Sequence, residues 1–317
     1  MMMHEESTRR YIYTYACHDN ERQLCEMELN ALFGTARRTG GFLESETMID
    51  PSRSPFMSSR IEVLFMGERL EDISAQAAAL SLDGRTFKVI YVKSGDELSY
   101  EEQRAAERQV GQHIRGKAEM RKPDVTYSLM SIQGRWLIGT YLKAESVWLQ
   151  HKHKPRNYST GLSTLVARAL VNIAAPDPSG MRAIDPCCGM GNVLIEALSM
   201  GLDIVGRDIN PLAVRGARIN LRHFGYESGR VQLGDLNEVD QQYDAAIVDM
   251  PYNLCSVLPP EERQQMLTSI RRFSKRSVIV SSEELEDEIR NAGLCIIDYG
   301  TVSKGSFVRH IWLCEAQ

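Results

Sequence analysis

Two short motifs in this chain carry residue types that can do chemistry. The first, Asp185-Pro186-Cys187-Cys188-Gly189-Met190-Gly191, resembles a glycine-containing loop that holds a nucleotide cofactor. The second, Asp249-Met250-Pro251-Tyr252, begins sixty-four residues after the first and could hold a planar amino group. In this order, the two motifs predict methyl transfer from S-adenosylmethionine to the exocyclic nitrogen of a base.

The glycine loop predicts where the cofactor binds. Gly189 and Gly191 permit positive φ and a close approach of the backbone to a ligand, and the N–H groups that open the following helix favour a carboxylate or phosphate. Leu194 stands where a dinucleotide fingerprint has its third glycine, which disfavours NAD. S-adenosylmethionine has no pyrophosphate, so a shorter loop suffices. The predicted cofactor residues are Asp185, Cys187, Cys188, Gly189, Gly191, Asn192, Asp208, Ile209, Asp235 and Leu236.

Three aspartates in this set have different predicted contacts. Each ends a predicted strand, and ligands of open α/β sheets bind at the carboxyl ends of strands. Asp185 could reach the ammonium or sulfonium region of the cofactor, Asp208 the ribose hydroxyls, and Asp235 the adenine amino group. Helix capping or turn chemistry is the structural alternative for each of them.

The second motif predicts a clamp for the target base. Asp249 accepts hydrogen bonds when ionised, and Pro251 holds Met250 extended, so that the Met250 carbonyl has a set direction. These acceptors could take both amino hydrogens, Asp249 could accept the released proton, and Tyr252 could stack on the base. A carboxylate matches the N1–H and 2-amino donors of guanine better than the N1 acceptor of adenine. The predicted catalytic residues are Asp249, Met250, Pro251 and Tyr252.

From residue 181 onward the hydrophobic pattern alternates between strands and helices. Asn210 caps one helix, which begins with Pro211. The last two segments leave no room for a helix between them and predict a hairpin. The pattern is typical of an α/β, Rossmann-like class I methyltransferase fold with a mostly parallel sheet and a closing hairpin. Strands are predicted at 182–185, 203–208, 230–235, 245–249, 277–281, 294–302 and 307–314, and further helices at 192–200, 260–273 and 283–292.

The first half of the chain predicts a separate α+β domain. We place it at residues 1–150 and the methyltransferase domain at 151–317, with a polar, basic connector over 143–158 and a helix over 161–175. Strands are predicted at 11–17, 86–93, 125–132 and 135–142, and helices at 21–32, 61–80 and 100–115.

Composition excludes several classes of protein. Hydrophobic residues make up 43% and charged residues 25%, as in ordinary globular proteins. No apolar run reaches the roughly 20 residues of a membrane span, and the polar start lacks the apolar core of a secretory signal, so we expect a cytoplasmic protein. The seven cysteines form no CxxC pair, and His151 and His153 lie in a charged linker, so we expect neither a disulfide framework nor a metal site.

Charge is unevenly distributed along the chain. The net charge is −5, but residues 104–156 carry eleven Lys and Arg against four Asp and Glu, a local +7 that leaves −12 for the rest. A basic segment on an acidic protein predicts contact with nucleic-acid phosphates, and a solvated helix face followed by a linker is the alternative. The predicted RNA-binding residues are Lys117, Arg121, Lys122, Lys152, Lys154 and Arg156.

These motifs resemble those of the THUMP-containing tRNA guanine-N2 methyltransferases of archaea and eukaryotes. The resemblance is strongest over 155–255 and includes the glycine loop, Ile195-Glu196-Ala197, Gly206-x-Asp208-Ile209 and Asp249-x-Pro251-Tyr252, which matches the Asp-Pro-Pro-Tyr motif of that family. It implies that the first motif binds S-adenosylmethionine and the second the target guanine. A looser similarity over 87–124 implies a THUMP module behind a small ferredoxin-like segment, which binds structured RNA, here tRNA.

Two positions depart from the family pattern. Met250 stands where the family has Pro, and Met190 where Thr is usual. They leave open methylation of rRNA, of adenine N6 or of a protein glutamine, and also a catalytically silent RNA-binding protein that retains the fold. Oligomeric state is not predicted.

Overall fold

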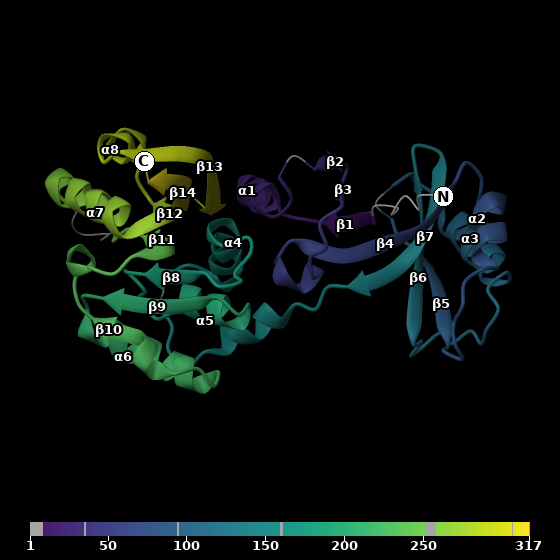
Figure 1. Ribbon diagram of the computed structural model, residues 1–317, viewed down its shortest axis with the longest axis horizontal. Helices are drawn as coiled ribbons and strands as arrows, with labels where there is room; N and C mark the ends of the chain where they lie inside the picture. The colour runs from purple at the N-terminus through teal and green to yellow at the C-terminus, as the bar shows by residue number, and fades with distance from the viewer. Residues whose placement is uncertain are drawn as a thin grey trace, which may run out of the picture. The chain divides into compact units, whose positions relative to one another are not determined.

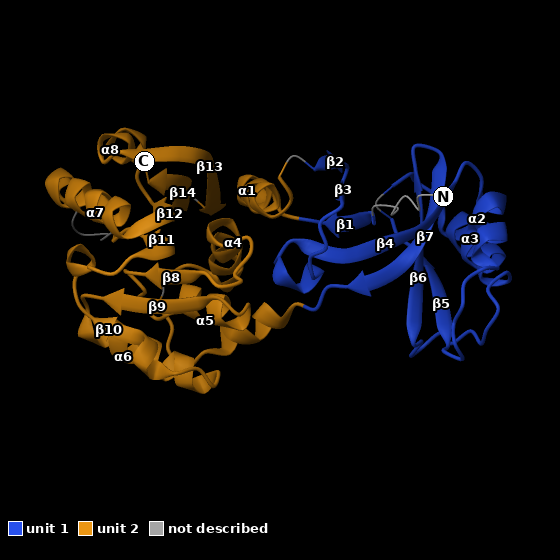
Figure 2. Ribbon diagram, in the orientation of Figure 1, with its two compact units in different colours: residues 1–16, 35–145 blue, residues 17–34, 146–317 orange. Residues whose placement is uncertain are grey.

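The structure, a computed structural model, describes residues 9–34, 36–93, 95–158, 161–251, 258–305 and 307–316. The chain divides into two compact units, one of residues 1–16 and 35–145 and the other of residues 17–34 and 146–317 (Figure 2). Among the residues described, no helix is long and apolar enough to cross a membrane.

The first unit is a sheet with two helices packed on it (Figure 1). Its elements are β1 (Tyr11–Tyr15), β2 (Arg37–Thr39), β3 (Phe42–Ser45), η2 (Pro51–Arg53), β4 (Met57–Gly67), α2 (Leu70–Ala77), β5 (Phe87–Tyr91), α3 (Tyr100–Gly111), β6 (Val125–Ile132) and β7 (Arg135–Lys143). The seven strands lie in the order β2-β3-β1-β4-β7-β6-β5, and among the described residues only strands β5 and β6 pair in parallel. Ile73 of α2 and Val110 of α3 are buried in one apolar cluster with Phe87 and Leu129 of the sheet.

The structure corrects the prediction of a helix over 61–80. Residues up to Gly67 belong to strand β4, and helix α2 begins only at Leu70. Strand β4 pairs with β1 on one side and β7 on the other, and these two ladders outweigh the helical spacing of its apolar residues. The short strands β2 and β3 were not predicted.

The second unit contains the alternating elements. They are η1 (Asp19–Glu21), α1 (Arg22–Phe33), η3 (Val147–His153), α4 (Thr164–Ala174), β8 (Arg182–Asp185), α5 (Asn192–Ser199), β9 (Asp203–Asp208), α6 (Pro211–His223), η4 (Ser228–Arg230), β10 (Val231–Leu233), η5 (Leu236–Glu238), β11 (Tyr243–Asp249), α7 (Pro260–Phe273), β12 (Ser274–Ser281), α8 (Glu286–Asn291), β13 (Leu294–Lys304) and β14 (Phe307–Ala316). The strand order is β10-β9-β8-β11-β12-β14-β13. Strands β8 to β12 run in parallel, whereas β14 is antiparallel to both of its neighbours. The predicted parallel sheet with a closing hairpin is therefore confirmed.

Strand β11 occupies the middle of this sheet. Its residues Ala245, Ala246, Ile247 and Val248 have no exposed surface. A strand that is buried on both faces reads as a continuous apolar run, as this one does. The strand thus holds Asp249, its last residue, on a rigid support.

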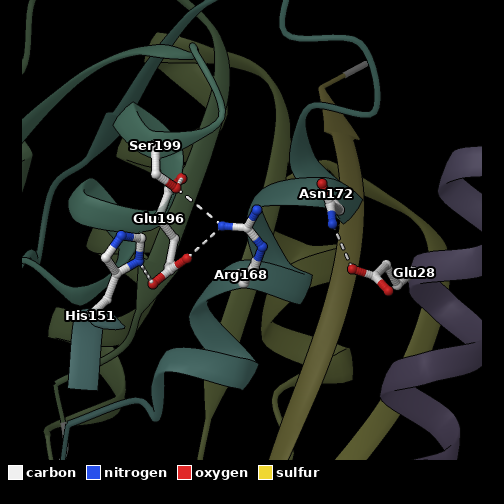
Figure 3. Close-up of polar contacts among 6 residues, drawn as sticks. All are labelled: Glu28, His151, Arg168, Asn172, Glu196 and Ser199. Atoms are coloured by element: carbon white, nitrogen blue, oxygen red, sulfur yellow. Dashed lines mark hydrogen bonds and ion pairs between the residues drawn. The ribbon is translucent and has the colours of Figure 1, made fainter. Parts of the chain in front are cut away.

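Helix α1 precedes most of the first unit in sequence but packs within the second. The sequence analysis assigned it to the N-terminal region. In the structure Asn172 of α4 donates a hydrogen bond to the buried carboxylate of Glu28 on α1, with a distance of 2.6 Å (Figure 3). Gly300 of β13 lies so close to α1 that a Cβ atom there would be 2.8 Å from Met27 Sδ.

A second buried carboxylate, that of Glu196 on α5, holds three segments together. Glu196 accepts hydrogen bonds from Arg168 of α4 at 2.8 Å and pairs with Nδ1 of His151 of η3 at 2.6 Å (Figure 3). Arg168 also donates to Ser199 Oγ at 3.1 Å. Glu196 and Arg168 are 1% and 2% exposed, so each charge has lost its water and is stabilised mainly by the other. The cluster anchors helix α5, which begins directly after the glycine loop.

Replacing Glu196 with alanine should lower the free energy of unfolding by about 3–5 kcal/mol, because the Arg168 guanidinium would stay buried without its partner. Urea denaturation of the wild type and the variant measures the difference. The control is Glu286→Ala, which breaks an exposed ion pair with Arg290 on α8 and should change the free energy of unfolding far less. Equal losses in the two variants would show that burial of the Glu196 pair is not decisive.

Candidate active site

The loop after β8 is tied to the end of β9 by backbone hydrogen bonds. Cys188 donates its N–H to the carbonyl of Arg207 at 2.9 Å, and Gly189 donates its N–H to Asp208 Oδ2 at 2.8 Å. Gly189 has φ of 51° and Gly191, the residue before α5, has φ of 81°. Both conformations favour glycine, which explains why the predicted loop needs glycine at these positions.

Asp208 has a structural role in addition to its predicted one. Its second carboxylate oxygen accepts the N–H of Asn210 at 2.8 Å, and Asn210 in turn caps α6, as predicted. A carboxylate offers about four lone-pair sites, so two backbone donors leave acceptor capacity for ribose hydroxyls. The turn alternative and the ribose prediction for Asp208 are therefore compatible.

Asp235 follows β10 and lines a cleft together with Asp208. Its Oδ1 accepts the N–H of Asn237 at 2.8 Å and caps the short helix η5. Asp208, Ile209, Asp235 and Leu236 all line one cleft of about 850 Å³, together with Pro186, Cys187, Asn237, Glu238, Asp249, Pro251, Leu258, Glu262, Gln265 and Met266. The structure thus gathers the residues predicted for the nucleoside half of the cofactor in one place.

Asp185 lines a second, smaller pocket, which shares Cys187 with this cleft. Asp185 is 3% exposed and accepts the N–H of Cys187 at 3.3 Å. Burial raises the pKa of Asp185 well above its usual range, and the neighbouring carboxylates of Asp249 and Asp208 raise it further. Burial raises the pKa of the Cys187 thiol, and the carboxylates of Asp185, Asp208 and Asp249 raise it further, which keeps the thiol neutral. Such a site favours a ligand that brings positive charge or hydrogen-bond donors.

Asp249 occupies the end of β11 and has an unsatisfied acceptor. Among the residues described, no donor reaches its buried Oδ1. Burial raises the pKa of Asp249 to about 7, against the opposing effect of the Arg309 guanidinium. Met250 continues the sheet geometry, because its N–H donates to the Val280 carbonyl at 2.8 Å and its side chain is buried in the apolar cluster with Met266 and Ile279. Tyr252 lies outside the described residues.

A second acceptor without a donor lines the same pocket as Asp249. Asn192 donates through Nδ2 to the Leu162 carbonyl at 2.6 Å, and this bond orients the amide, whose buried Oδ1 has no partner among the described residues. The pocket has a volume of about 160 Å³ and is lined by Tyr158, Gly161, Leu162, Asp185, Cys187, Cys188, Gly189, Met190, Asn192, Val193, Asp249, Met250 and Pro251. It shares Cys187, Asp249 and Pro251 with the larger cleft.

Several lining residues were not predicted from the sequence. Tyr158 and Leu162 precede α4 in a segment interpreted as connector and helix start, and Glu262 and Gln265 come from α7. Glu262 and Gln265 are three residues apart and therefore share a helix face. That spacing was visible in the sequence, but which face meets the cleft depends on packing.

The predicted RNA-binding residues fall into two groups. Lys117, Arg121 and Lys122 are exposed in the first unit, between α3 and β6. Lys152 and Lys154 lie in or just after η3 of the second unit, and Lys152 packs over the Trp148 ring at 5.3 Å. Burial lowers the pKa of Lys154. Arg156 follows them and is exposed. Within the described part of the chain, no three His, Cys, Asp or Glu side chains are grouped to hold a metal ion.

Comparisons with known proteins agree with this architecture. A family model described as a methyltransferase domain matches residues 177–299. The tRNA (guanine(10)-N2)-dimethyltransferase of Methanothermobacter thermautotrophicus is 30% identical over 173 residues, 51% of this chain and 51% of that protein. The mouse U6 snRNA (guanine-N(2))-methyltransferase THUMPD2 is 26% identical over 56% of this chain and 34% of its own length. The chain is thus similar, over about half of its length, to enzymes named for guanine-N2 methylation of tRNA or U6 snRNA.

A solved structure extends the similarity along the chain. TrmN from Thermus thermophilus superposes with a TM-score of 0.50 and 16% identity, and the match covers 97% of this chain and 100% of that one. At this identity it shows the fold alone, and it confirms the class I methyltransferase fold. The chain spans about half the length of the first curated relatives it matches.

Replacing Asp249 with asparagine should make folding stability less sensitive to pH. The pKa of Asp249 is raised to about 7 in the folded state, above its unfolded value, so between about pH 4 and 7 unfolding releases a proton and wild-type stability falls as pH rises. The free energy of unfolding of the variant minus that of the wild type should therefore be higher above pH 7 than at pH 4, by on the order of a few kcal/mol. Chemical denaturation across this range tests this. A stability difference that stays constant with pH would contradict it.

Proposed function

We propose that this protein transfers methyl from S-adenosylmethionine to the N2 amino group of a guanosine in RNA, with tRNA as the RNA class. The observation that carries the proposal is the acceptor Oδ1 of Asp249, which is buried, without a donor among the described residues, and placed where the two pockets meet. Methyl transfer to an amino group needs an acceptor at this point, both to orient the nitrogen and to take its proton.

The cleft fits the proposed cofactor in size and charge. Asp208 and Asp235 lie along the part that would take the ribose and adenine, and the buried Asp185 lies where the methionine half would approach. When bound, S-adenosylmethionine supplies an electrophilic methyl group on a sulfonium centre. The cluster of carboxylates favours that positive charge, and the Asn192 Oδ1 can accept a hydrogen bond from the ammonium group.

Asp249 and the Met250 carbonyl provide the proposed clamp. Met250 keeps its place because its N–H pairs with Val280 and its side chain packs in the core, so methionine there retains the extended backbone that the clamp requires. An aspartate with a pKa of about 7 is well matched to accept a proton near neutral pH. The base must leave its stack to reach this depth.

RNA as the substrate rests on the basic residues and on the relatives. The predicted RNA-binding residues are exposed or, for Lys154, partly buried, and the similar proteins are named for guanine-N2 methylation of tRNA or U6 snRNA. Guanine is favoured because an ionised Asp249 accepts from two neighbouring donors. A protonated Asp249 could instead donate to adenine N1, so identification of the methylated nucleoside is essential.

The test is transfer of labelled methyl from S-adenosylmethionine to unmodified tRNA and rRNA pools, followed by nucleoside analysis. We expect label in N2-methylguanosine from tRNA, and at least a hundredfold slower transfer by Asp249→Asn, because a neutral amide cannot take the proton; general-base removal typically costs about 10²–10⁴-fold. Cofactor binding by calorimetry should persist in the variant.

The matched control is Asp244→Asn, which makes the same change on the same strand in a side chain that pairs with Lys275. It should transfer methyl at the wild-type rate. Label in N6-methyladenosine would replace guanine with adenine as the target. Cofactor binding without transfer to any RNA would favour a protein substrate or a catalytically silent RNA-binding protein.

A further inference from the structure

Two segments of the second unit contain no acidic residue. The segments 146–163 and 209–226 each contain three basic residues, Lys or Arg, and between them they contain three histidines. Neither segment contains Asp or Glu. The whole chain has 42 acidic residues in 317, so 36 residues of average composition would carry about five. Acidic side chains are therefore missing from two places that are far apart in sequence.

The structure brings these two segments together. The N–H of Arg156 donates to Asn220 Oδ1 at 2.8 Å, and Asn220 Nδ2 donates to the Arg156 carbonyl at 2.8 Å. A Cβ atom on Gly216 of α6 would lie 3.8 Å from the Arg156 Cβ atom, so the linker rests directly on this helix. The nearby acid Glu196 is buried and already paired with Arg168 and His151. Of the basic side chains in these segments, Lys152, Arg156, Arg215 and Arg222 are exposed, whereas Lys154 is half-buried.

Helix α6 carries an arginine face on its exposed side, whereas Gly216 and Asn220 lie on its buried side. Arg215, Arg218 and Arg222 are exposed and, at spacings of three and four residues, project from one side of the helix. They line a concave surface of about 330 Å³ with Pro211, Val214 and Leu233. Arg218 donates to the Val231 carbonyl at 2.7 and 3.0 Å, whereas Arg215 and Arg222 have no acidic side chain within 4.0 Å among the described residues.

The Asn220 contact connects the linker and α6 with the candidate active site. Asn220 Nδ2 also donates to the Met190 carbonyl at 2.9 Å, and Met190 packs against Gly216. Met190 and Tyr158, two residues beyond Arg156, both line the pocket that contains Asp249. A strand lying over α6 and the linker would therefore reach the rim of that pocket.

We propose that Arg215 and Arg222 of α6, together with Arg156 of the linker, bind phosphates of the substrate RNA next to the target nucleotide. Guanidinium groups suit this role because they hold phosphate oxygens through paired N–H donors. The proposal rests on the proposed function, since it takes RNA as the substrate, and it adds the α6 arginines, which the sequence analysis did not select.

The test compares the double variant Arg215→Gln/Arg222→Gln with the wild type. Arg218 stays unchanged because it is bonded to Val231. Binding of an unmodified tRNA transcript is measured over a series of KCl concentrations. Two lost phosphate contacts should reduce the slope of log K against log[KCl] by about 1.5, with weaker binding at each concentration. Affinity for S-adenosylmethionine should not change, because neither arginine lines the cofactor cleft.

The control, Lys275→Gln/Arg290→Gln, removes two exposed positive charges from other parts of the same unit. It should keep the wild-type slope. A wild-type slope in the α6 variant, or an equal change in both variants, would overturn the α6 surface while leaving methyl transfer to RNA intact. Absence of RNA binding and transfer in the wild type would overturn the proposed function and the α6 surface with it.

Discussion

The second unit is organised around three carboxylates that meet where parallel strands end. Asp185, Asp208 and Asp249 close strands β8, β9 and β11, which are neighbours in the sheet. Bringing like charges together in a partly buried site costs free energy, and the fold tolerates it in two ways. Backbone N–H groups of Gly189 and Asn210 donate to Asp208, while Asp185 and Asp249 have raised pKa values and hold protons more readily. A ligand with positive charge or donor groups would relieve the remaining cost.

The rigid surroundings explain how such a site persists. Four residues of β11 before Asp249 are completely buried, and the helix that the glycine loop opens is held by the Glu196 cluster. His151 belongs to the segment that enters the second unit, so one carboxylate anchors both that segment and α5. A buried ionic cluster of this kind adds little net stability compared with apolar packing. Its contribution here is that it specifies one arrangement of α4, α5 and η3.

The sequence predicted what depends on local pattern and on topology. Strands β8 and β9 were predicted with their observed bounds, because each combines an apolar run with a turn signal, and parallel topology then gathered their terminal aspartates at one edge. Long-range contacts were not predictable. The assignment of α1 to the second unit depends on its packing against α4, and β4 became a strand because it has partners on both sides. The free acceptor of Asn192 likewise depends on its bond to Leu162, which no local pattern reveals.

The distribution of charge in the second unit suits the proposed reaction better than uniform charge would. The cleft is acidic and attracts a sulfonium cofactor, but the same field repels a polyanionic strand. The acid-free segments at the linker and α6 provide the opposite sign, and under the proposal they would bind phosphates while a neutral base enters the pocket alone. Bringing the base to Asp249 would then add a hydrogen-bond donor at its Oδ1, which has none among the described residues, and no phosphate would have to enter the acidic cleft. Because the acidic cleft and the basic segments are separate parts of one unit, a cationic methyl donor and an anionic RNA could be bound at the same time.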